Sequence, residues 1–133
     1  MFRFKKSLDV IQLFHKTGSP TSTKAADFLK RIAVQASESA SEDKANRDPF
    51  ELQVTEEPPT QDQLQTMLDY AGDKGISSIV EGAKTSSEAL RLVKENVDRL
   101  RRPITVDWNN GKVYAGAEES EILKMLNALP SKK

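Results

Sequence analysis

The chain has 133 residues, the length of one domain spanning 1–133, with no cysteine, one histidine and equal numbers of basic and acidic residues, 20 each. The lack of cysteine excludes disulfides, thiolate nucleophiles and cysteine metal sites, and one histidine excludes multi-histidine metal sites. Zero formal net charge argues against nucleic-acid binding driven by bulk electrostatics, and no apolar run approaches the roughly 20 residues that span a membrane.

The first third of the chain predicts a strand, a turn and a helix. The apolar run Val10–Phe14 is typical of a buried central strand. Gly18 and Pro20 end this strand, and apolar residues at three- and four-residue spacing predict a helix from about Thr21 to Ala36. Residues 37–48 are polar and low in complexity, so we expect a mobile loop within the domain.

A second strand and a second helix come after this loop. Phe50–Val54 alternates apolar and polar residues, which predicts a strand, and a parallel pairing with the first strand would complete a right-handed βαβ unit. Thr60 and Gln63 have the spacing of a capping box at the start of the second helix, and Gly72 is placed to end it. A short buried turn or helix is expected at Ile76–Val80.

A third helix is expected from a cap at Ser86 or Ser87, with an apolar face that runs from Ala89 to Leu100. Its C-terminal end would carry three arginines against the helix dipole, namely Arg99, Arg101 and Arg102.

The last elements are two strands and a helix. The strand Ile104–Trp108 precedes the tight-turn signal Asn109-Asn110-Gly111, and Lys112–Gly116 returns as its antiparallel partner. The last helix starts among Glu118, Glu119 and Glu121 and carries an apolar core face of Ile122, Leu123, Met125, Leu126 and Leu129. A parallel βαβ half followed by a hairpin and a covering helix describes an α/β, thioredoxin-like domain with a four-stranded mixed sheet flanked by helices.

Three segments resemble known proteins of this fold. Leu13–Ser22 resembles the strand, loop and helix of glutaredoxin-dependent arsenate reductases and Spx-type regulators, and Glu57–Thr60 resembles their entry to the second helix. Arg102–Val106 resembles their arginine–proline strand start. The nearer match is a fungal family of mitochondrial proteins assigned to redox function, to which Val106–Gly111 is the most specific link.

The resemblance implies a redox scaffold in which hydroxyls replace thiols. The reductase cysteine would fall on Ser19, and an Spx-type pair of cysteines on Ser19 and Ser22. Pro103 would be the cis proline that faces the active turn, and Arg102 the arginine that holds an oxyanion. A serine nucleophile needs an adjacent base, for which His15 is the sole histidine.

These residues indicate two classes of function. The first, carried by the resemblance, is a thioredoxin-fold redox protein, oxidoreductase-like by family but without thiol chemistry of its own, and mitochondrial by resemblance. The second is a non-catalytic module that binds a small anion or glutathione through Ser19, Thr21, Ser22 and Arg102, or an interaction scaffold. No metal, other cofactor or nucleic acid is indicated, and no protein partner is identified.

Plainer interpretations of the same residues stay open. Ser19 or Thr21 can be an ordinary helix N-cap, and Arg102 a solvated charge at a helix end. Asp107 is expected to be an exposed strand-end carboxylate, and Trp108 a packing residue beside the hairpin.

Overall fold

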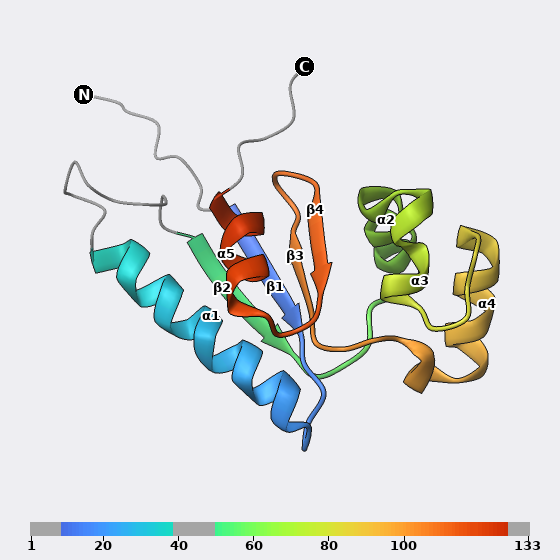
Figure 1. The fold of residues 1–133 in the computed structure, drawn as a ribbon, viewed down its shortest axis with the longest axis horizontal. Helices are drawn as coiled ribbons and strands as arrows, with labels where there is room; N and C mark the ends of the chain where they lie inside the picture. The colour runs from blue at the N-terminus through green and yellow to red at the C-terminus, as the bar shows by residue number, and fades with distance from the viewer. Residues whose placement is uncertain (1–8, 39–49, 128–133) are drawn as a thin grey trace.

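Four strands form one mixed sheet in the computed structural model, which describes residues 9–38 and 50–127 (Figure 1). The sheet order is β2-β1-β3-β4. The central strand β1 (Asp9–Phe14) pairs in parallel with β2 (Phe50–Thr55) and antiparallel with β3 (Ile104–Asp107), and β3 pairs antiparallel with β4 (Lys112–Ala115). The four-stranded mixed sheet expected from the sequence is confirmed.

Helices cover both faces of this sheet. On one face, α1 (Pro20–Glu38) and α5 (Glu119–Asn127) pack on Ile11 and Leu13 of β1. On the other face lie α2 (Gln61–Ala71), α3 (Ile76–Ile79) and α4 (Ser86–Glu95), as Figure 1 shows. Successive β1 side chains point to opposite faces, so Phe14 belongs to the second core cluster with Ile104 and Val106.

The ends of the first two helices follow local sequence signals. The capping box at α2 is confirmed: the Thr60 Oγ1 atom accepts the Gln63 N–H at 3.1 Å, and the Gln63 Oε1 atom accepts the Thr60 N–H at 3.0 Å. Gly72, with φ at +77°, follows the last residue of α2. Helix α1 runs on through Ser37 and Glu38, while the rest of the expected polar loop, residues 39–48, lies outside the described residues.

The third helix was predicted wrongly at both ends. Thr85 rather than Ser86 or Ser87 caps α4, and the helix stops at Glu95. Asn96 is extended, and its side chain accepts the Asp98 N–H to start the 3-10 helix η2 (Val97–Arg99). An asparagine side chain that bonds its neighbouring backbone competes with continued helix, which explains the early stop.

Because α4 ends at Glu95, its last turn does not carry the three arginines that were expected there. Arg99 donates to the Glu81 carbonyl at 3.2 Å, and Arg101 donates to the Ser77 carbonyl at 3.1 Å. Both bonds tie the segment after η2 to the region of α3.

The hairpin of β3 and β4 is confirmed, with a four-residue loop that contains Gly111 at a φ of +67°. Strand β3 ends at Asp107, so Trp108 belongs to this loop. The Trp108 Nε1–H donates to the Gln12 Oε1 atom at 3.0 Å, and the indole packs edge-on against Tyr70, which supports a packing role. On α5, Leu123 is exposed rather than part of the core, and Leu129 lies outside the described residues.

Two strand threonines, one with an unpaired hydroxyl and one with a bonded hydroxyl, test how side-chain hydrogen bonding contributes to the stability of the sheet. Thr105 in β3 is fully buried, and its hydroxyl has no hydrogen-bond partner among the described residues, whereas the Thr55 Oγ1 atom accepts the Gln12 amide at 2.9 Å. We expect Thr105→Val to raise the free energy of unfolding by about 1 kcal/mol, because the substitution removes an unsatisfied hydroxyl, and Thr55→Val to lower it by about 1 kcal/mol. Urea denaturation measures both, and a loss of stability in Thr105→Val would contradict the unpaired hydroxyl.

Candidate functional site

The candidate site lies at the carboxyl end of β1, where three segments meet. Phe14 pairs with Ile104, so the residues that follow and precede them, His15 and Pro103, approach each other at this end of the sheet. The peptide bond between Arg102 and Pro103 is cis, which is the isomer that the resemblance implies. The parallel neighbour β2 ends beside them, since the His15 N–H donates to the Thr55 carbonyl at 2.8 Å.

The turn after β1 is closed by its own backbone. The Ser19 N–H donates to the Lys16 carbonyl at 3.2 Å, and Gly18 between them has a φ of +86°, which favours glycine. The Ser19 Oγ atom accepts the Ser22 N–H at 3.2 Å, and the Ser19 carbonyl accepts the first helical N–H from Thr23 at 2.9 Å. Ser19 is therefore the N-cap of α1, and Thr21 is an exposed residue in its first turn.

Ser22 is the buried centre of the turn. Its side chain is fully buried, and its Oγ atom accepts the Lys16 N–H at 2.8 Å and lies 2.5 Å from the His15 Nδ1 atom. The Ser22 hydroxyl therefore holds both the Lys16 backbone and the His15 ring, since it accepts the Lys16 N–H and shares a hydrogen bond with Nδ1. The histidine thus pairs with Ser22 and not with Ser19.

This geometry does not make a serine nucleophile. Ser22 has no surface open to a substrate, and Ser19 uses its oxygen as a helix cap. No third group among the described residues has a hydrogen bond to the His15 Nε2 atom, which an orienting residue would need. The hydroxyls hold the turn together and leave no activated oxygen.

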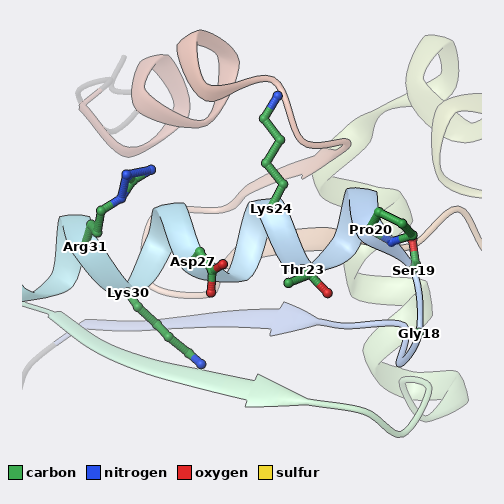
Figure 2. A pocket seen from close by; sticks show the side chains of 8 residues that line it. All are labelled: Gly18, Ser19, Pro20, Thr23, Lys24, Asp27, Lys30 and Arg31. Atoms are coloured by element: carbon green, nitrogen blue, oxygen red, sulfur yellow. The ribbon is translucent and has the colours of Figure 1, made fainter.

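A groove of about 860 Å³ opens at Ser19 and follows the outer side of α1 (Figure 2). Its charged side chains are Lys24, Lys30 and Arg31 together with Asp27. Figure 2 shows Lys24 and Arg31 extending from one side of the helix and Lys30 from the other. Arg31 pairs with Glu119 at 3.5 Å, whereas Lys24 and Lys30 have no ion pair within the described part of the chain.

The lining of this groove differs from the expected site. Of the four residues proposed for anion binding, Ser19 lines the groove, while Thr21, Ser22 and Arg102 are absent from its walls.

Arg102 comes directly before Pro103, at the carboxyl end of β1. Its Nη1 atom donates to the Glu56 carbonyl at 3.3 Å, and its Nε atom is buried with no hydrogen-bond partner among the residues described. No carboxylate within residues 9–38 and 50–127 pairs with the Arg102 guanidinium. The Lys16 Nζ atom in the turn lies 3.7 Å from the Asp98 carboxylate, which ties η2 to the turn.

Comparison with known proteins assigns the chain to a family. The model of a family described as a protein of unknown function, DUF1687, matches residues 2–116. The chain belongs to the DUF1687 family. A relative from Schizosaccharomyces pombe, named "Putative redox protein fmp46, mitochondrial", is 41% identical over 64 residues, which are 48% of this chain. The match spans 53%, about half, of that relative's own length.

Within the described ranges no three histidine, aspartate or glutamate side chains gather as metal ligands. In those ranges no helix is both long and apolar enough to cross a bilayer.

Asp107 is a residue whose setting sequence reasoning missed. It was expected to be exposed, yet only 1% of its surface is accessible. The Asn110 side-chain amide donates to the Asp107 carboxylate at 2.9 Å and to the Asp9 carboxylate at 3.4 Å, while the Asn109 Oδ1 atom accepts the Val10 N–H at 2.8 Å. These bonds join the hairpin loop to the start of β1, at the opposite end of the sheet from the turn. Two asparagines after a strand-end aspartate were the available signal.

Removing the buried hydroxyl tests the role of Ser22. We expect Ser22→Ala to lower the free energy of unfolding by about 1–3 kcal/mol, because the Lys16 N–H and the His15 ring lose a buried partner. Ser19→Ala is the matched control and loses a helix cap, about 1 kcal/mol. Denaturant titration of both variants measures the order, and a Ser22→Ala protein as stable as the unsubstituted chain would show that the network contributes nothing.

Proposed function

We propose that this chain is a thioredoxin-like mitochondrial protein that binds a small dicarboxylate ligand of the glutathione type and carries out no thiol exchange itself. The sheet order, the βαβ half followed by a hairpin and helix, and the cis proline at the start of β3 support the fold. The name of the Schizosaccharomyces pombe relative supports the redox association and the compartment.

Binding without thiol exchange accounts for the chemistry of the turn. A chain with no cysteine cannot cycle through a disulfide, and a serine hydroxyl is far too weak an acid to replace a thiolate at working pH. At the two positions where the resemblance places cysteines, Ser19 caps the helix and Ser22 is buried. On this proposal the turn is that of a redox scaffold, and ligand binding is the part of that role for which the chain still has groups.

The observation that carries the proposal is the guanidinium of Arg102. Arginine has five N–H donors and stays charged, yet here one bond goes to the neutral Glu56 carbonyl and the buried Nε atom has no partner among the described residues. The Nη2 group donates to no residue in the described ranges, so an incoming carboxylate would pair with the Nη end of the guanidinium. Such an anion would lie beside the turn, because Arg102 precedes the proline at the carboxyl end of β1.

The groove at Ser19 supplies charges for the other end of a ligand. Lys24 and Lys30 are unpaired cations among the described residues, and Asp27 between them is a single carboxylate. Glutathione has two carboxylates and one ammonium group, so its charges complement Arg102, Lys24 and Asp27. The two carboxylates would then bind on the two sides of the turn.

A cysteine-restoring variant tests the absence of thiol chemistry. We expect the unsubstituted chain to show no disulfide reduction above a protein-free control with glutathione, glutathione reductase and NADPH. Ser19→Cys should gain one thiol that reacts with Ellman's reagent in the native state, since a helix N-terminus stabilises a thiolate. The buried Ser22→Cys is the matched control and should react only on unfolding. Turnover by the cysteine-free chain would overturn the proposal.

Glutathione titration tests the binding site. In ¹⁵N-resolved NMR spectra, S-methylglutathione at millimolar concentration should shift the amides of residues 18–24 and of Arg102. We expect Lys24→Gln and Arg102→Gln each to weaken binding about three- to tenfold through loss of one charge-assisted contact. Lys74→Gln, an exposed cation in η1 (Asp73–Gly75), is the control and should change nothing.

Two outcomes of this titration would contradict the assignment. Absence of shifts at the turn would exclude ligand binding there. Loss of affinity in Lys24→Gln with none in Arg102→Gln would assign the ligand to the α1 groove alone and remove Arg102 from the site.

A further inference from the structure

A second concavity lies on the other face of the sheet, between the start of α2, α4 and η2. It encloses about 230 Å³. Its walls are mainly apolar side chains, with one amide and one ammonium group among them: Pro58, Pro59, Leu64, Leu90, Val93 and Val97, with Gln61 and Lys94. Neither Ser19 nor Arg102 lines this crevice, so a role for it is independent of the function proposed for the turn.

The size of the crevice limits its occupant. Sites for whole small molecules enclose about 300–1,000 Å³, and this volume falls below that range. One large aliphatic or aromatic side chain fits such a space, whereas a cofactor or a metabolite with its polar groups does not. The volume therefore favours a single side chain presented by a peptide.

The walls are formed before any occupant arrives. Pro58 and Pro59 have fixed φ angles, and the capping box of Thr60 and Gln63 fixes the backbone that comes after them. Leu64 is fully packed in the core and supplies the floor. A rigid wall loses little conformational freedom on binding, so more of the contact energy appears as affinity.

The charge at the rim selects a class of partner. Lys94 is exposed in the last turn of α4, and it has no ion pair within the described ranges. The other charges of this helix are engaged: Arg91 pairs with Glu95 at 3.2 Å, and Glu88 accepts the Lys84 N–H at 2.8 Å. A free cation beside an apolar crevice complements an acidic group next to an apolar side chain.

We propose that this crevice is a docking site for a peptide segment of a partner protein, with a leucine or phenylalanine inserted between α2 and α4 and an adjacent acidic residue paired with Lys94. One side of the crevice lies close to the turn, because Val97 of its wall precedes Asp98, whose carboxylate pairs with Lys16. The geometry thus assigns the α2–α4 side of the protein to partner binding.

Synthetic peptides test the docking site on the full chain. The probe is a fluorescently labelled twelve-residue serine–glycine peptide with a central Leu-Glu or Phe-Glu pair, and its affinity is measured by anisotropy and its position by ¹⁵N-resolved NMR. We expect shifts at Leu90, Val93, Lys94 and Val97. Replacing the anchor by alanine in the peptide should weaken binding about tenfold, since an apolar anchor supplies most of the contact.

Charge exchange separates this site from general electrostatics. Lys94→Glu should weaken the Leu-Glu peptide about tenfold and strengthen a Leu-Lys peptide, because the exposed charge changes sign without disturbing the core. Lys24→Glu on α1 is the matched control: it should leave peptide affinity unchanged, while Lys94→Glu should leave S-methylglutathione binding unchanged.

Three results would overturn the proposal. The first is no shift around the crevice with either peptide at millimolar concentration. The second is equal weakening by Lys94→Glu and Lys24→Glu, which would show unspecific attraction. The third is binding of 4-phenylbutyrate at the crevice as tightly as the peptide, which would make the occupant a small carboxylate rather than a protein segment.

Discussion

The double pairing of β1 positions everything else in this protein. Residues 11–14 are buried, with β2 hydrogen-bonded in parallel on one side and β3 antiparallel on the other. A strand held on both edges and both faces has one register, because a slip by one residue would turn Ile11 and Leu13 away from α1. That register fixes the positions of the turn after Phe14, of the start of α1, and of Arg102-Pro103 opposite.

The chemistry of the turn depends on how its hydroxyls are used. In this arrangement Ser22 satisfies the Lys16 N–H and the His15 ring, and Ser19 satisfies the Ser22 N–H. A reactive thiol at the position of Ser19 or Ser22 would instead need to be free to exchange with a substrate. The same helix N-terminus that would activate a cysteine here stabilises a neutral, closed loop, so the capping interpretation of Ser19 follows from the geometry itself.

Elements whose signals are local could be predicted from the sequence. The capping box at Thr60 and Gln63 and the apolar run of β1 depend on residues a few positions apart, and both formed as expected. The end of α4 depended on both a local cap and a long-range pairing. Val97 and Leu100 continue the helical spacing, but Leu100 forms a bridge with Val80, and the Asn96 side chain starts η2 instead.

Side-chain contacts between segments far apart in the sequence were also difficult to predict. Asp107 was expected to be exposed, but it is buried where the Asn110 amide donates both to its carboxylate and to that of Asp9 in β1. The resemblance singled out Ser19 and Arg102 as site residues, but it could not show that Ser22 would pair with His15, or that the groove at Ser19 would follow α1. Those facts depend on side-chain directions that a linear pattern does not contain.

The two candidate surfaces, the turn after β1 and the crevice between α2 and α4, lie at different places on the sheet. The turn is built at the end of β1, and the crevice is built from α2 and α4 on one face. Helix η2 connects them, since Val97 forms part of the crevice wall and Asp98 pairs with Lys16. That pair is exposed and worth at most about 1 kcal/mol, so it cannot transmit a large conformational change. The two sites would therefore bind their ligands independently. A partner in the crevice and a small anion at the turn would occupy neighbouring positions on the same scaffold. On the function proposed above, a protein without thiols would then act by holding two ligands close together.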